Sequence, residues 1–402
     1  MKFIDGKIPI GWSEVKMGSL VKVGRGSSPR PIHNYLSENG IPWVKIADAT
    51  SSMNKYIEST KQFIIEEGRS TSVKPGDLIV SNSATPGIPK IMAINACVHD
   101  GWLVFDDYKN IDKLYLYYFF LFFRKTLNHS ASGSVFKNLK TDIVRNIDLI
   151  LPDDLQEQKA IAQVLTAFDD KIENLQAQNQ TLETLAQTIF KEWFGKYQVD
   201  DELPEGWRVG EIGDLTVIKR GGSPRPIKDY ISDSGYRWLK ISDATATDSP
   251  YIFEIKEHIK VEGLSKTTLK KAGDLVLSNS ATPGMPKFLA VDTCVHDGWM
   301  HFPSSIVSNE YLYLLFLHIR PKLVQQGSGS VFVNLKTDIL RYYETIIPSN
   351  QALKDFDKLI KPVFDKILNN SKQIQSLTKT RDTLLPKLMS GQLRVEGFKS
   401  NL

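Results

Sequence analysis

Two arginines in this chain stand between prolines, in the matching segments Ser28-Pro-Arg-Pro-Ile32 and Ser223-Pro-Arg-Pro-Ile227. The prolines stiffen the backbone on both sides, so we expect each loop to hold its guanidinium outward. A guanidinium presents a planar fork of N–H donors, which suits a guanine edge or a phosphate. Arg30 and Arg225 are therefore candidates for contacts with nucleic acid.

A second polar loop is also repeated, because Ser81-Asn-Ser-Ala-Thr-Pro-Gly87 returns as Ser278 to Gly284. An asparagine amide can bond an adenine edge twice, and hydroxyl groups bond either bases or phosphates. Nearby lysines could neutralise phosphates, and a repeated Gly-Ser pair would let the backbone approach closely. The candidate DNA-contacting residues are Ser28, Arg30, Lys45, Ser81, Asn82, Ser83, Thr85, Lys90, Ser134, Asn138 and Lys140 in the first copy, and Ser223, Arg225, Lys240, Ser278, Asn279, Ser280, Thr282, Lys287, Ser330, Asn334 and Lys336 in the second.

Ordinary turn chemistry explains any single one of these residues equally well, because Pro, Gly, Ser and Asn are turn formers. It explains the whole set less well. Long loop stretches are identical between the copies, whereas the strands between them have diverged more. This pattern favours a shared binding function for the loops.

The repetition extends over the whole chain. Cys97 to Trp102 returns as Cys294 to Trp299, and Asn138 to Ile143 returns as Asn334 to Ile339. The spacing is far longer than the 20 to 50 or so residues of a solenoid repeat, so this is a duplicated domain. Two like domains imply a target that presents two like sites.

Each copy has a globular part and a long helix. The globular parts, residues 11–150 and 206–347, mix short β-rich runs with polar loops and one aromatic-rich helix, which predicts an α+β fold. The predicted strands include 43–46, 77–80 and 274–277, and the predicted helices lie near 114–127 and 310–323.

Two long helices follow Pro152-Asp-Asp154 and Pro348-Ser-Asn350. Their apolar residues recur in alternating steps of three and four, which indicates a coiled coil rather than a helix lying on its own domain. We expect the two helices to pair antiparallel. Placing Asn179 opposite Asn370 aligns the two stripes throughout. The core of this predicted register pairs Ile172 with Leu377, Leu175 with Ile374, and Leu182 with Ile367, with Trp193 facing Phe356 further out. Phe168 would face Arg381, where a cation–π contact is expected.

These observations divide the chain into five parts: a globular domain 1–152, a helix 153–198, a second globular domain 199–348, a second helix 349–391 and a tail 392–402. Two like domains on antiparallel helices predict an internal pseudo-two-fold axis.

The sequence shows little catalytic chemistry. It has no phosphate-binding loop, no Rossmann glycine fingerprint and no Cys-x-x-Cys pair. An acidic cluster at 153–159 resembles a nuclease site, but its copy lacks the acids. Cys97, His99 and Asp100 could suggest a triad, but neighbours along one extended segment do not converge. We expect no catalytic residue and no bound metal.

Composition sets broad limits. A net charge of +4 permits nucleic-acid binding without arguing for it. There is no long apolar run and no signal-peptide core, so we expect a cytoplasmic protein. A disulfide between Cys97 and Cys294 would join two separate domains and is not expected.

The order of parts resembles the specificity subunit of type I restriction-modification systems over essentially the whole chain. Leu385-Pro-Lys-Leu-Met-Ser-Gly391 looks like the family's end-of-repeat signature, and Phe190-Lys-Glu-Trp-Phe194 looks like its first-repeat counterpart. Pro152 with Glu157-Gln-Lys-Ala-Ile161 resembles the family's helix-opening segment.

The resemblance implies that each globular part is a target recognition domain reading half of a bipartite double-stranded DNA site. It implies that the helices act as a spacer and dock two methyltransferase subunits, and that two restriction (motor) subunits can join. The complex, rather than this chain, would use S-adenosylmethionine, ATP and Mg²⁺. Recognition domains within one chain of this family are usually dissimilar, whereas here they are alike.

The sequence is also compatible with two other hypotheses about function. One is the specificity chain of a smaller modification and cleavage system without a separate motor. The other is a coiled-coil scaffold whose duplicated heads bind a protein or a glycan instead of DNA.

Overall fold

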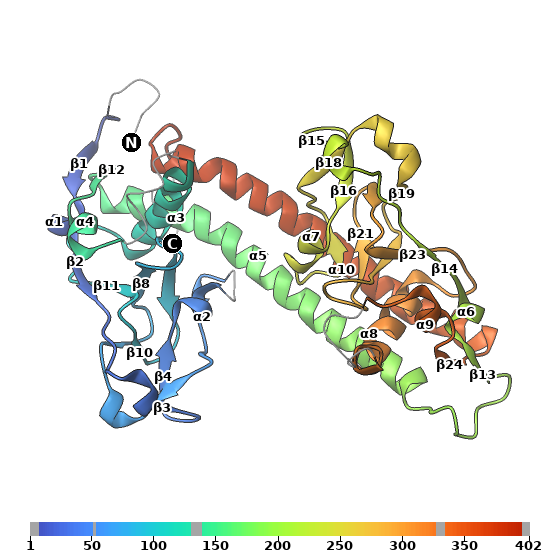
Figure 1. Ribbon diagram of the computed structural model, residues 1–402. Helices are drawn as coiled ribbons and strands as arrows, with labels where there is room; N and C mark the ends of the chain where they lie inside the picture. Colours follow the sequence, from blue (N-terminus) through green and yellow to red (C-terminus); the bar gives the residue numbers. More distant parts are fainter. Residues whose placement is uncertain (1–7, 51–53, 130–138, 327–333, 396–402) are drawn as a thin grey trace. The chain divides into compact units, whose positions relative to one another are not determined.

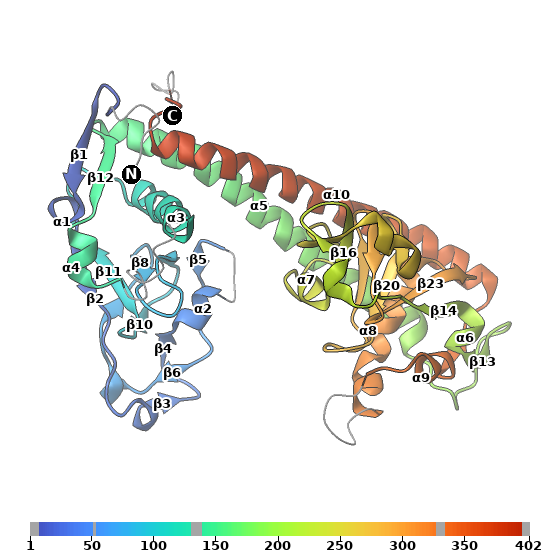
Figure 2. The same ribbon diagram turned by 45° about the horizontal axis from the view of Figure 1, so that its top comes forward.

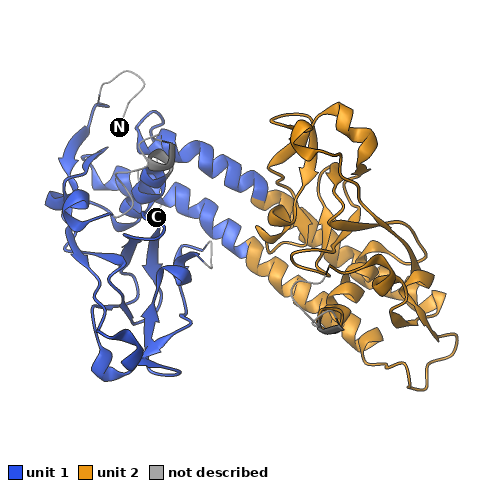
Figure 3. Ribbon diagram, viewed as in Figure 1, with its two compact units in different colours: residues 1–174, 375–402 blue, residues 175–374 orange. Residues whose placement is uncertain are grey.

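The structure is a computed structural model that describes residues 8–50, 54–129, 139–326 and 334–395. It divides into two compact units, shown in Figure 3: unit 1 comprises residues 1–174 and 375–402, and unit 2 comprises residues 175–374. Each unit therefore combines one globular part with portions of both long helices. The division between compact units falls within the helices and not at their ends.

Unit 1 holds the elements of the first repeat (Figure 1). Its strands are β1 (Trp12–Lys16), β2 (Lys22–Arg25), β3 (Leu36–Ser37), β4 (Ile41–Val44), β5 (Tyr56–Ile57), β6 (Phe63–Ile64), β7 (Ser72–Val73), β8 (Leu78–Ser81), β9 (Pro89–Met92), β10 (Ala96–Val98), β11 (Trp102–Asp106) and β12 (Asp148–Pro152). Its helices are α1 (Met17–Leu20), α2 (Ile46–Thr50), α3 (Lys113–His129), α4 (Thr141–Arg145), the first part of α5 (Leu155–Phe190) and the last part of α10 (Asn350–Met389).

Unit 2 repeats this list. Its strands are β13 (Arg208–Glu211), β14 (Thr216–Arg220), β15 (Ile231–Ser232), β16 (Tyr236–Leu239), β17 (Tyr251–Ile252), β18 (Glu257–Ile259), β19 (Thr268–Lys270), β20 (Leu275–Ser278), β21 (Pro286–Leu289), β22 (Thr293–Val295), β23 (Trp299–Ser305) and β24 (Glu344–Ile347). Its helices are α6 (Ile212–Leu215), α7 (Ile241–Thr245), α8 (Asn309–Gln326), α9 (Thr337–Arg341) and much of α10 (Asn350–Met389).

The sheets of the two units have the same strand order. In unit 1 the orders are β1-β12, β3-β6-β4-β10-β7 and β2-β11-β8-β9-β5. In unit 2 they are β13-β24, β15-β18-β16-β22-β19 and β14-β23-β20-β21-β17. The terminal ribbon pairs the first and last strands of each globular part, as β1 and β12 show in Figure 2. The α+β class and the duplication predicted from the sequence are confirmed.

Buried runs form the central strands, and the aromatic helices cover them. All four residues of β8 are buried, as are all four of β20, its counterpart. Helix α3 joins the same hydrophobic core as β8 and β11, and α8 does so with β20 and β23. The strand predicted at 43–46 was placed too far along the chain, because β4 ends at Val44 and Ile46 already begins α2.

Both long helices begin where the sequence predicts. The Asp154 carboxylate accepts a hydrogen bond from the N–H of Gln156 at 2.8 Å, which satisfies an open donor in the first turn of α5. The hydroxyl of Ser349 accepts from the N–H of Ala352 at 3.3 Å at the start of α10. After Phe190, α5 continues as a π-helical turn, Lys191–Gly195.

In unit 2 the helices pair antiparallel in the predicted register. The side-chain amide of Asn370 donates to Oδ1 of Asn179 at 3.0 Å, and both residues are buried. Further along, the rings of Trp193 and Phe356 lie 5.9 Å apart, as the same register requires. The amide of Asn179 also donates to the Ser371 hydroxyl at 3.1 Å. A buried polar pair of this kind costs stability but fixes alignment.

In unit 1 one predicted helix contact is wrong. Arg381 does not use the ring of Phe168; its Nη1 donates to the Asp169 carboxylate at 2.7 Å. Asp169 is 6% exposed and also accepts from the hydroxyl of Tyr118 at 2.8 Å. A carboxylate one residue along α5 attracts a guanidinium more strongly than a ring face does, so the ion pair displaces the cation–π contact.

No helix in the described part of the chain is long and apolar enough to cross a membrane.

A buried histidine distinguishes the two halves and supports a prediction about pH. His301 lies on β23, where the corresponding strand of unit 1 carries Val104. His301 is 6% exposed, its Nδ1 has no hydrogen-bond partner, and burial lowers its pKa to about 4. An imidazole in the unfolded chain has a pKa of about 6.5.

The folded state holds His301 neutral, whereas the unfolded chain takes up a proton at this residue below about pH 6.5. The contribution of His301 to the unfolding free energy is therefore fully present above pH 6.5 and is lost as the pH falls towards 4. Between pH 7 and pH 5 this histidine should cost unit 2 about 2 kcal/mol of unfolding free energy. We expect His301→Val to remove that part of the pH dependence, measured by denaturant unfolding at both pH values. Equal losses in the wild type and the variant would contradict the prediction.

Candidate nucleic-acid interface

In unit 1 the proline-flanked arginine meets a carboxylate that comes from 70 residues further along the chain. Nη2 of Arg30 lies 3.3 Å from Oδ2 of Asp100, and the hydroxyl of Ser28 donates to Oδ1 of Asp100 at 2.8 Å. The Arg30 side chain is 75% exposed and that of Asp100 is 40% exposed. The loop thus presents a guanidinium whose position is set by a carboxylate beneath it.

Asn82 connects this arginine loop to the other predicted loops. Its side-chain amide donates to the carbonyl of Asp100 at 3.0 Å, and its backbone N–H donates to the carbonyl of Gly101 at 2.8 Å. Its own carbonyl accepts from the N–H of Leu139 at 2.8 Å, which places Lys140 beside the same cluster. Segments far apart in the sequence therefore converge on one side of unit 1.

Hydrogen bonds of the Ser81 hydroxyl stabilise the loop from Ser81 to Gly87. The Ser81 hydroxyl donates to the carbonyl of Thr85 at 2.6 Å and accepts from the N–H of Ile88 at 2.8 Å. Ala84 at the tip has a φ of 58°, which is uncommon for a residue other than glycine. The bonds from Ser81 stabilise this strained tip, which leaves Ser83 and Thr85 half-buried near the surface.

Unit 2 repeats this arrangement. Nη2 of Arg225 lies 3.1 Å from Oδ2 of Asp297, and the Ser223 hydroxyl donates to the Asp297 carboxylate at 2.5 Å. The amide of Asn279 donates to the carbonyl of Asp297 at 3.1 Å, and its carbonyl accepts from Leu335 at 2.8 Å. The tip residue here, Ala281, again has a φ of 58°. The same network has survived in both copies while their strands diverged.

The two clusters share the same electrostatics. The hydrogen bond from Ser28 holds the pKa of Asp100 below its ordinary value, and Arg30 adds to the effect. Ser223 and Arg225 do the same for Asp297. Both carboxyl groups are therefore ionised at neutral pH.

The neighbouring histidines are neutral. Burial lowers the pKa of His99 and of His296. Each accepts a hydrogen bond at Nδ1, from Gly101 and Gly298 respectively, at 2.7 Å. They act as packing groups under the loops, with the rings of Trp43 and Trp238 nearby at 6.2 and 5.8 Å.

The structure separates the predicted residues into surface and interior groups. The exposed or half-buried ones are Ser28, Arg30, Lys45, Ser83, Thr85 and Lys140 in unit 1, and Ser223, Arg225, Lys240, Ser280, Thr282, Asn334 and Lys336 in unit 2. Ser134, Asn138 and Ser330 lie outside the described residues. Lys240 forms an ion pair with Glu257. The buried ones are Ser81, Asn82, Lys90, Ser278, Asn279 and Lys287.

Burial corrects the role predicted for two lysines. Lys90 and Lys287 are 3% and 6% exposed, and burial lowers the pKa of each to about 8. Lys90 donates to the carbonyl of Asn54, and Lys287 donates to that of Thr247 at 2.8 Å. Their ammonium groups point into the protein, so they support the fold and do not neutralise phosphates. Ser81, Asn82 and their copies likewise shape the loops from within.

Comparison with known proteins decides the family. A family model described as type I restriction modification DNA specificity domain matches residues 9–184 and again residues 204–379. The chain belongs to this family. Its members are specificity subunits, which are non-catalytic components of type I restriction-modification complexes and act there with DNA and other subunits.

Individual relatives agree over nearly the full length. The chain is 28% identical to the type I restriction enzyme MjaIX specificity subunit of Methanocaldococcus jannaschii, over 97% of this chain and 95% of that one. It is 23% identical to the HindI specificity subunit of Haemophilus influenzae, over 95% and 99%. The fold is similar to the crystal structure of the type I restriction-modification S subunit from M. genitalium, with a TM-score of 0.59 and 14% identity over 96% of this chain and 98% of that one.

Within this specificity subunit, the carboxylates of Asp100 and Asp297 were not among the residues predicted to contact DNA. Asp100 was predicted only as a member of a rejected catalytic triad and Asp297 was not singled out, yet each contacts the arginine of its loop. Arg25 and Arg220 were also missed; their Nε atoms donate to the carbonyls of Asp100 and Asp297 at 2.8 and 2.5 Å. The sequence feature that could have revealed the two carboxylates is the identity of the segments Cys97–Trp102 and Cys294–Trp299.

The groups suspected of catalysis serve the fold of the specificity subunit. Glu157 forms two hydrogen bonds with Arg394, at 2.6 and 2.8 Å, and so ties the C-terminal segment to the start of α5. Gln158 is buried and donates to the carbonyl of Pro152 at 2.8 Å. Cys97 and Cys294 are buried and free. No group of three or more His, Cys, Asp or Glu side chains in the described ranges could hold a metal ion.

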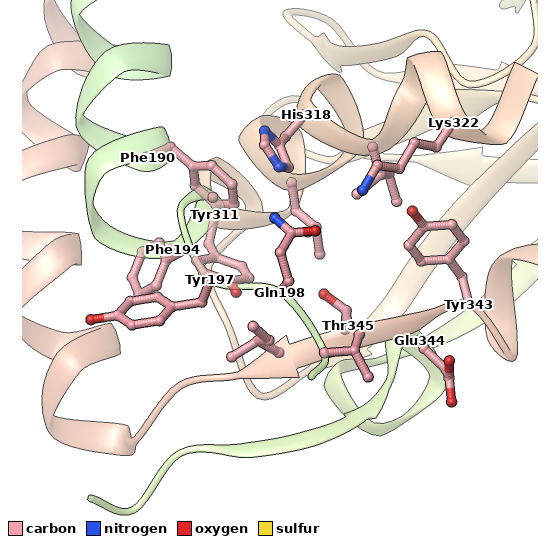
Figure 4. A pocket seen from close by; sticks show the side chains of 15 residues that line it. Phe190, Phe194, Tyr197, Gln198, Tyr311, His318, Lys322, Tyr343, Glu344 and Thr345 are labelled. Carbon is pink, nitrogen blue, oxygen red and sulfur yellow. The ribbon is translucent and has the colours of Figure 1, made fainter. Parts of the chain in front are cut away.

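Unit 2 contains a cavity of about 110 Å³ (Figure 4). It lies beside the π-helical turn, between the rings of Phe190 and Tyr311 and the side chains of His318 and Lys322. Unit 1 carries Phe119 and Phe123, stacked with centroids 5.6 Å apart, where unit 2 carries Leu315 and Ile319. The side chains at these repeat positions are therefore smaller beside the cavity in unit 2.

Proposed function

We propose that the two units read the two halves of one interrupted DNA site and that these half-sites are nearly identical. The observation that carries the proposal is the repeated cluster of arginine, carboxylate, serine and asparagine, which has the same hydrogen bonds in both units. A guanidinium fork and hydroxyl groups are suited to base edges in the major groove. Exposed Lys45, Lys140 and Lys336 would set position on the phosphate backbone.

The half-sites should be inverted relative to each other. Helices α5 and α10 pair antiparallel around Asn179 and Asn370, and antiparallel helices that carry like domains favour a two-fold relation between those domains. Half-sites related by a two-fold are inverted repeats on opposite strands. The target is therefore an interrupted, nearly palindromic sequence.

Differences between the loops limit the symmetry. His33-Asn34 becomes Lys228-Asp229, and Ile88 becomes Met285. The polar difference at His33-Asn34 could change one base of the motif, because a single bidentate contact discriminates by about 1–3 kcal/mol. Ile88 is buried in the core of unit 1 and makes no such contact. Sequencing of methylated bases in a host carrying this system tests the proposal. Two unrelated half-sites would mean that these loops do not read the bases.

We further propose that the long helices form a spacer that docks two methyltransferase subunits and that two restriction subunits can join. The assembled complex would use S-adenosylmethionine, ATP and Mg²⁺, with none of these bound by this chain. The antiparallel pairing around Asn179 and Asn370 supports a spacer of defined length. Co-purification of the intact chain with each partner tests the docking, and failure to recover a methyltransferase subunit would contradict it.

The chain by itself should bind DNA weakly or dissolve poorly. A net charge of +4 is small for a site spanning two half-sites, and phosphate neutralisation supplies much of the affinity that is independent of sequence. The methyltransferase partner should therefore supply much of the basic surface. Gel-shift titration with and without that partner is the measurement. Specific nanomolar binding by the purified chain alone, in physiological salt, would show the expectation to be wrong.

A further inference from the structure

Arg30 and Arg225, the arginines proposed to contact bases, form ion pairs with Asp100 and Asp297 that stability does not explain. The members of the first pair are well exposed, with 75% and 40% of the side chains of Arg30 and Asp100 accessible, and an ion pair this exposed adds little to stability. Yet the pair is present in both units with the same atoms in contact, Nη2 to Oδ2.

The carboxylate is held more firmly than the arginine. Oδ1 of Asp100 accepts from the Ser28 hydroxyl, and the Asp100 N–H lies 3.3 Å from that same hydroxyl oxygen. The Asp100 carbonyl accepts from Arg25 and Asn82 at 2.8 and 3.0 Å. Asp100 is thus held in place by its own neighbours, and its carboxylate orients the exposed guanidinium of Arg30.

Pairing changes what the arginine can recognise. A guanidinium bonded to a carboxylate carries almost no net charge as a pair, so it gains little from a phosphate. Of its five N–H donors the contact with Oδ2 uses one, which leaves a fork for the O6 and N7 atoms of guanine. The carboxylate therefore favours a base edge over the DNA backbone.

We propose that Asp100 and Asp297 are specificity-determining positioning residues, which hold Arg30 and Arg225 towards base edges and keep them from phosphates. This inference rests on the proposed function. It assigns a role to two carboxylates that contact Arg30 and Arg225 but do not themselves make the main contact with the base.

The experiment uses the complex of this chain with its methyltransferase subunits. Binding is measured to a duplex carrying the methylated motif and to a duplex with both half-sites scrambled, over a range of salt concentrations. For Asp100→Asn and for Asp297→Asn, the preference for the motif should fall about tenfold or more, since one bidentate base contact is loosened. Affinity for scrambled DNA should rise. The slope of log affinity against log salt concentration should steepen by the equivalent of about one released counterion.

Controls separate position from charge and from folding. Asp148→Asn removes the same charge from an exposed pair with Lys16, outside the cluster, and should leave the preference unchanged. Ser28→Ala keeps the charge but loosens the carboxylate, so it should lower the preference without steepening the salt dependence. It also tests the proposal if an asparagine variant fails to fold.

Two results would overturn the inference. If the wild-type complex shows no preference for the motif, the proposed function itself fails. If the wild type is specific but the asparagine variants keep its preference and bind scrambled DNA no more tightly, only the positioning role fails.

Discussion

Replacing Arg30 by alanine should relax one base position in one half of the methylated motif, and replacing Arg225 should relax the matching position in the other half. Each guanidinium is exposed at the surface of its loop, and each is oriented by a carboxylate in the same way. Loss of a bidentate arginine–guanine contact costs about 1–3 kcal/mol of discrimination, or roughly 5- to 150-fold between bases. The measurement is methylome sequencing of hosts that express each variant.

Matched controls exist in both units. Arg69 is exposed and paired with Glu66 at 2.6 Å, and Arg208 is exposed and paired with Asp214 at 2.9 Å. Alanine at either position removes the same side chain without touching the cluster, so the motif should stay as in the wild type. A variant of Arg30 that relaxed both halves equally would contradict the assignment of one unit to one half-site.

Replacing Arg381 by alanine should destabilise unit 1 by about 3–5 kcal/mol, because it strands a buried charge. Asp169 is 6% exposed, and after the change the hydroxyl of Tyr118 would remain as its side-chain donor. A loss of this size is a large fraction of the stability of a typical domain. Denaturant unfolding measures it, and hydrogen exchange shows whether the loss lies in unit 1.

Unit 2 supplies the control for this prediction. At a constant repeat spacing, Ile161, Leu165 and Ile172 of α5 correspond to Phe356, Ile360 and Ile367 of α10. The same spacing makes Phe364 the counterpart of Asp169 and Ala186 the counterpart of Arg381. Leu314 corresponds to Tyr118 at a spacing one residue longer, the one that aligns Tyr115 with Tyr311. All three counterparts are buried in the hydrophobic core of unit 2.

The triple change Tyr118→Leu, Asp169→Phe and Arg381→Ala therefore copies an apolar arrangement that the fold already contains. Replacing a buried ion pair by packed apolar groups is often neutral or stabilising. We expect the triple variant to recover most of the stability lost in Arg381→Ala. An Arg381→Ala variant that loses less than about 1 kcal/mol would show that water reaches the Asp169 carboxylate.

The sequence alone determined the duplication, the two long helices and their register. These features depend on local signals that recur: a proline and an N-cap before each helix, apolar steps of three and four, and one asparagine in each stripe. A stripe of this kind has few ways to align, so matching Asn179 with Asn370 was enough to predict the contact seen at 3.0 Å.

The tertiary structure decided which loop residues face outward. Asn82 and Lys90 have the residue types of DNA contacts, but bonds to distant backbone carbonyls turn both inward. Asp100 acquires its place from Ser28, 72 positions away, and Asp169 from Arg381, 212 positions away. Such contacts depend on which distant segments pack together in the folded chain. The sequence does not show this packing, and a polar side chain is equally suited to solvent, to DNA or to a buried partner.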